Sequence, residues 1–354
     1  MPVPHPEPDF WRARRVLVTG HTGFKGSWIA LWLHQLGAKV TGIALRPCDQ
    51  SLFRLLRLDG QVSSHFIDLR DAAAIAAAVE DTQPELVLHL TAQTSVHRSV
   101  LEPAESFAIN VLGTVNLLNA LRTIPTLRSV LVVTTDKVYA DDHDGRAHAE
   151  QDRLGGRDPY SASKAACELA TTAMAQSFLA PQGVAVATAR AGNVIGGGDF
   201  SPGRLVPDAV NAALSGQTLT LRNPDASRPW QHVLDCLCGY LTYLAALTID
   251  PTLPRTMNFG PRSPQGPSVG EIASAMLEAL GAHQGCDYVP SPQVVETHAL
   301  ALDSTLARRT LGWSDRLPGR LMIDATAAWY RAWAQGADMR TVTSRQITGY
   351  ETLS

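Results

Sequence analysis

The sequence of 354 residues predicts an α/β protein built on a mainly parallel, doubly wound sheet. Three observations predict this fold. A β-rich run leads directly into a turn with three glycines, and an apolar helical pattern follows it. Strand and helix patterns then alternate regularly, which is typical of parallel strands joined by helices. After about residue 190, glycines and prolines cluster and the alternation weakens, which predicts a smaller mixed lobe.

Two units are therefore expected, residues 12–190 and residues 191–340, with segments that can interleave. The first unit is predicted to contain strands at 15–19, 39–45, 65–67, 86–90, 129–134 and 184–190, with helices at 27–36, 71–80, 103–124 and from Tyr160 onward. The second is predicted to contain helices at 204–214, 232–247, 269–280, 304–311 and 319–334, with short strands at 218–221 and 257–259.

Composition excludes several classes of protein. The net charge is −3 without a basic block, which argues against a nucleic-acid or anionic-membrane partner. No run approaches the roughly 20 apolar residues of a spanning helix, and residues 1–9 lack the apolar core of a signal peptide. The odd number of cysteines, five, indicates reduced thiols and a cytoplasmic protein. Cys236 and Cys238 lie in an apolar helical pattern without a second pair, so no metal site is expected.

The glycine turn predicts a binding site for a dinucleotide. Gly20, Gly23 and Gly26 follow the first strand with the spacing G-x-x-G-x-x-G. The first glycine permits a tight turn, the second lets the backbone approach a pyrophosphate, and the third lets the helix pack closely on the sheet. The free N–H groups at the start of that helix favour an anion. We therefore expect a Rossmann-type domain.

The choice between NAD and NADP stays open at the sequence level. The acidic residue that usually follows the second strand is missing, and Leu45-Arg46-Pro47 stands in its place. Arg46 could bind a 2′-phosphate or be a surface charge. Asp68 and Leu69, at the end of the third strand, are suited to contact adenine, although Asp68 could equally cap the following helix.

A polar stretch, residues 134–139, follows the apolar strand 129–134. The carboxyl ends of parallel strands are where ligands bind in such sheets. The alternative is a polar strand-to-loop junction in which Asp136 caps a turn. Downstream, Tyr160 and Lys164 are four residues apart and share one helix face. An ammonium beside the phenol favours phenolate and lowers the tyrosine pKa, which makes Tyr160 a candidate base for an alcohol that loses a hydride.

These features resemble the extended short-chain dehydrogenase/reductase family, in its NAD-dependent epimerase/dehydratase group. Within that family the resemblance is closest to the CDP-glucose 4,6-dehydratase type, and it covers nearly the whole chain. The segments that carry it are 18–28 (VTGHTGFKGSW), 51–53 (SLF), 158–164 (DPYSASK), 190–199 (RAGNVIGGGD), 222–224 (RNP), 228–233 (RPWQHV), 258–261 (NFGP) and 311–313 (LGW).

The resemblance implies oxidation, elimination and reduction on one nucleotide-activated hexose. Tyr160, assisted by Lys164 and Thr134, takes the 4-hydroxyl proton while NAD accepts the C4 hydride. The 4-keto group acidifies the C5 proton, the 6-hydroxyl leaves as water, and the hydride returns to C6. Related 4,6-dehydratases have Asp-Glu where this chain has Asp136-Lys137, which is similar to the CDP-glucose type.

We assign Asp136 as the acid for the 6-hydroxyl and Lys137, in its neutral form, as the C5 base; which is acid and which is base stays a hypothesis. Two rivals remain at this level. A sugar-nucleotide epimerase, or a 4,6-dehydratase of another nucleotide sugar, needs the same tyrosine and lysine, and an NAD-bound scaffold would share the fold without turnover.

The resemblance also implies the remaining contacts. Asn193 and Arg228 are expected to hold the phosphates and sugar, with Arg204 and His232 as further candidates, although Arg228 could form a structural ion pair instead. Asn110 is expected near the nicotinamide, unless it marks a helix kink. The polar loop 140–158 is expected near the sugar, and the helices 103–124 and 160–176 on a homodimer face. A role in deoxysugar biosynthesis, such as that of a lipopolysaccharide O-antigen, is the implied pathway.

The predicted cofactor-binding residues are Gly20, Thr22, Gly23, Phe24, Lys25, Gly26, Arg46, Asp68, Leu69, Leu90, Ala92, Gln93, Asn110, Thr134, Tyr160 and Lys164.

Overall fold

The computed structural model describes residues 6–140, 146–289 and 300–353. The expectations for the first five residues and for positions 141–145 of the polar loop lie outside the described residues.

One large sheet organises the described chain. It has seven strands in the order β3-β2-β1-β4-β5-β6-β10, and each neighbouring pair is parallel. The order reverses at β1, which pairs with β2 on one side and β4 on the other, as in a doubly wound dinucleotide fold. The predicted fold class is confirmed. The strands are β1 (Arg15–Thr19), β2 (Lys39–Ala44), β3 (Ser63–Phe66), β4 (Leu86–His89), β5 (Ser129–Val133), β6 (Ala185–Ala191) and β10 (Thr256–Phe259).

The central strands are apolar because both faces of the sheet are buried. Along β5, Val130 and Val132 enter one core cluster, whereas Leu131 and Val133 enter the other. Side chains alternate in this way because successive residues of a strand point to opposite faces. The alternation continues past the end of β5, so the side chains of Thr134 and Thr135 point in opposite directions.

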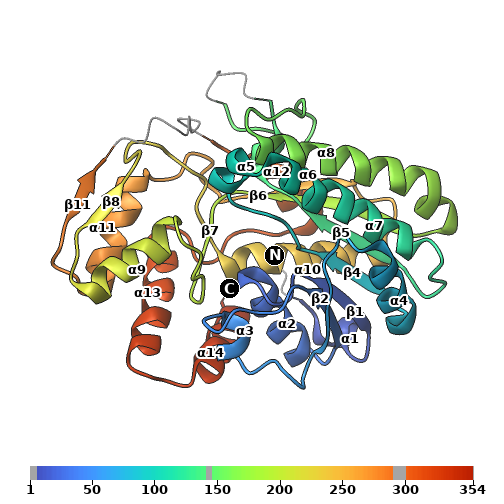
Figure 1. The fold of residues 1–354 in the computed structure, drawn as a ribbon, viewed down its shortest axis with the longest axis horizontal. Helices are drawn as coiled ribbons and strands as arrows, with labels where there is room; N and C mark the ends of the chain where they lie inside the picture. Colours follow the sequence, from blue (N-terminus) through green and yellow to red (C-terminus); the bar gives the residue numbers. More distant parts are fainter. Residues whose placement is uncertain (1–5, 141–145, 290–299, 354) are drawn as a thin grey trace.

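Helices cover both faces of the sheet (Figure 1). No helix in the described parts of the chain is long and apolar enough to cross a membrane. The helices of the larger unit are α1 (Pro8–Trp11), α2 (Phe24–Gln35), α3 (Leu52–Leu55), α4 (Ala72–Thr82), α5 (Val96–Leu101), α6 (Pro103–Phe107), α7 (Gly113–Leu121) and α8 (Pro159–Met174).

A smaller lobe lies beside the sheet, at the left of Figure 1. There, β8 (Leu219–Leu221) pairs with β11 (Cys286–Tyr288), and a separate pair joins the short strands β7 (Val194–Ile195) and β9 (Gln231–His232). Beyond α8 the helices are α9 (Leu205–Ser215), α10 (Val233–Ile249), α11 (Val269–Leu280), α12 (Thr305–Leu311), α13 (Arg320–Ala334) and α14 (Met339–Glu351). The chain returns to the large sheet through β10, which pairs with β6, so the two expected units interleave here.

The observed helices differ from the expected ones in several places; the short helices α1, α3 and α5, for example, were not predicted. The helix expected over residues 103–124 ends at Leu121 and contains a π-helical turn, Ala108–Leu112, between α6 and α7. The sequence analysis did not predict α14, because this segment is rich in polar residues. Its buried residues Met339, Thr343, Ile347 and Tyr350 nevertheless follow helical spacing.

The C-terminal segments are held to α10 by one buried carboxyl group. Asp235 accepts hydrogen bonds from the backbone N–H groups of Arg316 (2.7 Å) and Leu317 (3.2 Å) and from the Tyr350 hydroxyl (2.9 Å). Burial raises the pKa of Asp235 to about 7, although these donors oppose the rise.

The stability of the fold should therefore depend on pH through Asp235. Between about pH 4 and pH 7 the native carboxyl holds a proton that the unfolded chain releases, so the free energy of unfolding falls as pH rises. The slope is at most about 1.4 kcal/mol per pH unit. Asp235→Asn, which stays neutral, should lack this contribution. Urea unfolding of both proteins across this range measures it, and parallel stability curves would contradict it.

Candidate functional site

A cavity of about 590 Å³ opens at the carboxyl edge of the sheet, between the sheet and the smaller lobe. It brings together residues from positions far apart in the chain, between Gly20 and Val269. The predicted residues that line it are Gly20, Thr22, Gly23, Phe24, Lys25, Gly26, Leu90, Ala92, Thr134, Asp136, Lys137, Tyr160, Lys164, Asn193, Arg204 and Arg228.

Other predicted residues do not line this cavity. The guanidinium of Arg46 lies 5.0 Å from the ring centre of Phe66. Asp68 forms a salt bridge with Arg70 (2.6 Å), and Asp71 rather than Asp68 caps α4. Leu69 is buried among the apolar residues on one face of the sheet.

Asn110 and Gln93 turn inward and stabilise the loop after β4. Asn110 is fully buried in the π-helical turn. Its amide accepts from Gln93 N (2.8 Å) and donates to Gln93 O (3.1 Å) and Ser163 Oγ (2.9 Å). Asn110 therefore fits the alternative expectation, a residue that marks an irregularity in its helix. His232 is also fully buried, and its Nδ1 accepts from Leu234 N at the start of α10.

The glycine turn has the geometry that a dinucleotide requires. Gly20 has a φ of +75°, which favours glycine. A Cβ on Gly26 would lie 2.0 Å from the carbonyl oxygen of Gly20, so α2 packs against the turn only because this side chain is absent. No side chain of the described chain caps α2 at Gly23, which leaves the first N–H groups for a phosphate. These residues fit NAD, with the pyrophosphate at the start of α2.

The two threonines before Asp136 point in opposite directions. The Thr134 hydroxyl donates to the buried Glu168 at 2.5 Å. The hydroxyl beside the Tyr160 phenol belongs to Thr135, and it donates its one proton to Asp136 Oδ1 at 2.9 Å. The sequence analysis missed Thr135. The alternation of side chains along β5 was the signal that separates the two.

Burial controls the protonation of Tyr160 and Lys164. It raises the pKa of Tyr160 to about 12, and the nearby Thr135 hydroxyl opposes this only in part. The same cause lowers the pKa of Lys164, whose Nζ donates to Val133 O at 2.8 Å. The pKa of the phenol is therefore not lowered in the way the spacing of Tyr160 and Lys164 predicts. The phenol is protonated in this structure and must lose its proton to act as a base.

Asp136 is a buried carboxyl group with one free oxygen. It is 2% exposed, and its Oδ2 has no hydrogen-bond partner among the described residues. Burial raises its pKa, whereas the cations Lys137, Arg228 and Lys25 oppose the rise. Gly192 leaves the space beside it, because a Cβ there would lie 3.2 Å from Oδ2. Such an oxygen can donate a hydrogen bond to a bound molecule when it carries the proton, or accept one from it when it does not.

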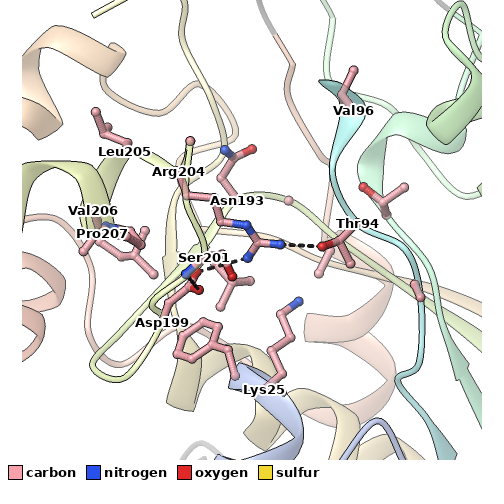
Figure 2. Close-up of a pocket in the computed structure, with 18 of the residues that line it drawn as sticks. Lys25, Thr94, Val96, Asn193, Asp199, Ser201, Arg204, Leu205, Val206 and Pro207 are labelled. Carbon is pink, nitrogen blue, oxygen red and sulfur yellow. Dashed lines mark hydrogen bonds and ion pairs between the residues drawn. The ribbon is translucent and has the colours of Figure 1, made fainter. Parts of the chain in front are cut away.

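Arg204 spans the mouth of the cavity (Figure 2). Its guanidinium donates to Thr94 Oγ1 in the loop after β4 (2.7 Å) and to Asp199 Oδ2 (3.1 Å). Lys25 points into the same space from the opposite side in Figure 2. Two cationic groups thus face one cavity, which suits an anionic ligand.

The smaller lobe contributes wall residues that the sequence analysis did not single out as site residues. Most of those named here come from the start of α9 and from β8 with the turn that follows it; Trp230 precedes β9, and Val269 begins α11. Their positions in the wall depend on how the lobe packs against the sheet, and short sequence patterns contain no information on that packing. The additional lining residues of this lobe include Leu205, Val206, Pro207, Leu219, Thr220, Leu221, Arg222, Asn223, Trp230 and Val269.

Comparison with known proteins identifies the family. Residues 16–260 match the sequence model of the "NAD dependent epimerase/dehydratase family". The chain belongs to this family. A CDP-glucose 4,6-dehydratase of Salmonella typhimurium strain LT2 is 38% identical over 349 residues, which cover 97% of both chains. A dTDP-glucose 4,6-dehydratase of Xanthomonas campestris pv. campestris is 28% identical, over 90% of this chain and 95% of the relative.

A solved structure agrees with the fold and the cofactor. The chain resembles the UDP-glucose 4-epimerase of Thermus thermophilus in complex with NAD, with a TM-score of 0.78 and 26% identity. The match covers 90% of this chain and 99% of that one. Together with the family, it confirms NAD as the cofactor.

Gly26→Ala should weaken NAD binding because the added Cβ pushes α2 away from the Gly20 carbonyl. We expect the dissociation constant to rise at least about tenfold, measured by calorimetry on cofactor-free protein. Gly285→Ala is the matched control, since nothing lies within 4 Å of its Cβ. Equal affinities of the two variants would contradict the close packing of the turn.

Proposed function

We propose that this chain is a CDP-glucose 4,6-dehydratase that forms the 4-keto-6-deoxy sugar. The observation that carries the proposal is the pair Asp136 and Lys137, which faces the same cavity as Tyr160 and Lys164. Removal of water needs an acid and a base beyond the tyrosine. The relative of 38% identity along nearly the whole chain supports CDP-glucose as the substrate.

In the first step, Tyr160 in its phenolate form takes the proton of the 4-hydroxyl. NAD, held by the glycine turn of Gly20, Gly23 and Gly26, would supply the hydride acceptor for C4 and the hydride donor for C6. We assign the assisting hydroxyl to Thr135 in place of Thr134, because burial raises the pKa of the Tyr160 phenol and the nearby Thr135 hydroxyl opposes that rise. Lys164 fixes the helix against β5 through its bond to Val133 O.

In the elimination, Lys137 in its neutral form removes the C5 proton, and protonated Asp136 gives its proton to the leaving 6-hydroxyl. The raised pKa of Asp136 supports the role of acid, because burial favours its protonated form. Its Oδ2 has no hydrogen-bond partner among the described residues, so it is the oxygen that we assign to the hydrogen bond with the 6-hydroxyl. Lys137 is less buried than Asp136, in keeping with a base that must exchange its proton.

Anionic groups of the substrate are assigned to the cationic side of the cavity. Arg228 offers a planar fork to the diphosphate and Asn193 contacts the sugar, with Arg204 as a further donor. His232 is assigned a supporting role, since it is buried at the start of α10. We also place the enzyme in the cytoplasm and in deoxysugar biosynthesis, for which five free cysteines and the proposed product are the support.

Lys137→Met provides the sharpest test of the elimination. The variant should exchange the C5 proton for deuterium at least about a hundredfold more slowly than the wild type, because its base is gone. Mass spectrometry of CDP-glucose incubated in D₂O measures this exchange together with loss of water. Undiminished exchange would remove Lys137 as the base.

The wild type tests the substrate in the same assay with CDP-, dTDP-, GDP- and UDP-hexoses. Loss of water from CDP-glucose is the expected result. A 4-epimer without loss of water would establish an epimerase instead. Bound NAD without turnover of any of these sugars would indicate a non-catalytic, NAD-bound scaffold.

We further propose a homodimer through α5 to α8. Large apolar side chains on the neighbouring helices α5, α6 and α8 and on the π-helical turn are between 39% and 66% exposed. Such a patch on a monomer marks an interaction surface. Its members are Val100, Leu101, Phe107, Leu112 and Leu169.

Leu169→Glu should dissociate the dimer, because a two-fold interface brings two copies of the same patch together and would bury the new charges. We expect the dimer dissociation constant to rise at least about tenfold, as measured by light scattering after size-exclusion chromatography. Leu214→Glu is the matched control: Leu214 is 56% exposed on α9, in the other lobe. Dissociation by both variants, or by neither, would contradict this interface.

A further inference from the structure

We propose that the buried ion pair Glu168–Arg190 positions groups for the elimination step. The pair holds the turn that carries Asp136 and Lys137 at a fixed place relative to the helix that carries Tyr160 and Lys164. The inference rests on the proposed function and adds residues to it. Neither residue of the pair lines the cavity, so both act through other residues.

Glu168 is the first part of the pair. It follows Lys164 by four residues on α8, so Tyr160, Lys164 and Glu168 lie on one helix face. Its carboxylate, 2% exposed, accepts from four donors. These are Thr134 Oγ1 at 2.5 Å, Thr188 Oγ1 at 2.7 Å, and Arg190 Nε and Nη2 at 2.9 Å each. Both oxygens therefore accept two hydrogen bonds each, and the carboxylate is fixed in orientation.

Arg190 is the second part, and it reaches the other end of the turn. From β6 its Nη1 donates to the Tyr139 hydroxyl (2.9 Å), and its guanidinium lies 4.8 Å from the centre of that ring. The Tyr139 hydroxyl in turn donates to Asn258 Oδ1 on β10 (2.6 Å). Tyr139 is thus fixed by two neighbouring strands of the sheet.

The two anchored residues flank the proposed acid and base. Thr134 precedes and Tyr139 follows the segment Thr135–Val138, which contains the 3-10 turn Asp136–Val138. Both ends of this short segment are hydrogen-bonded to the same ion pair. A segment this short, held at both ends, has little freedom, and displacements of about 1 Å at reacting groups can cost about a hundredfold in rate.

The arrangement predicts a selective effect. Loss of the Thr134 hydroxyl bond loosens one end of the turn, although Thr134 N still donates to Ala189 O (2.8 Å), and it leaves the Tyr160–Lys164 helix in place. Elimination should then slow more than oxidation at C4. A merely structural role would lower stability and slow both steps together, and a direct role of Thr134 at Tyr160 would slow oxidation first.

Thr134→Val and Thr188→Val form a matched pair for the test. Both remove one hydroxyl bond to Glu168, but Thr188 lies within β6, away from the turn. Single-turnover reactions of the holoenzyme with CDP-glucose measure C4 oxidation by absorbance of the reduced nicotinamide and elimination by loss of water. Thermal unfolding compares the stability of the variants.

We expect Thr134→Val to oxidise at about the wild-type rate, within about threefold, and to eliminate water at least about tenfold more slowly, so that reduced cofactor accumulates. Thr188→Val should keep the wild-type ratio of the two rates. Tyr139→Phe, which removes the hydroxyl bonds to Arg190 and Asn258 and so loosens the other end, should behave as Thr134→Val does. An unchanged ratio in Thr134→Val and Tyr139→Phe, with normal elimination by the wild type, would overturn the positioning role alone. Absence of water loss in the wild type would overturn the proposed function and the inference together.

Discussion

The parallel direction of the strands is the constraint on which the site depends. Because the seven strands of the described sheet run the same way, their carboxyl ends meet at one edge. The turn after β1 brings the glycines there, the loop after β5 brings Asp136 and Lys137, the proposed acid and base, and the segment after β6 brings Asn193. The reversal of strand order beside β1 opens a crevice at this edge, and the smaller lobe closes it into a cavity.

Burial within that cavity pushes the central groups toward their neutral forms. It raises the pKa of Asp136 and Tyr160 and lowers the pKa of Lys164. A protonated Asp136 is what an acid for a leaving hydroxyl requires, whereas a protonated phenol must be activated before it can accept a proton. In a site shielded from water, each charge that forms during reaction interacts strongly with the cations around it. Lys25 and Arg204, which face the cavity, are positioned to supply that field.

Short sequence patterns predicted those features of the structure that depend on residues close together in the chain. The glycine spacing predicted the close packing at Gly26, and apolar runs predicted the strands of the large sheet up to β6. The pairing of β10 with β6 was not predictable in this way, because a four-residue strand carries no record of its partner. The sequence pointed to Thr134 for the hydroxyl at Tyr160, whereas our proposal assigns Thr135, for a related reason: two adjacent threonines are equivalent in composition, and only the direction of each side chain at the end of β5 separates them. Asn110 and Gln93 illustrate the same limit, since both stabilise a loop from inside rather than line the cavity.

The buried pair Glu168–Arg190 extends this reasoning from where groups lie to why they stay there. Removing two charges from water is costly, and apolar residues of similar volume often stabilise a core better than an ion pair does. Apolar packing, however, would set no direction for the hydroxyls of Thr134 and Tyr139. A carboxylate that accepts four hydrogen bonds and a guanidinium bound to it fix those directions on two strands and one helix at once. A reaction that moves a proton, a hydride and a hydroxyl on one sugar needs several groups at fixed relative positions. A rigid buried link between the sheet and the helix that carries Tyr160 and Lys164 meets that need better than packing alone.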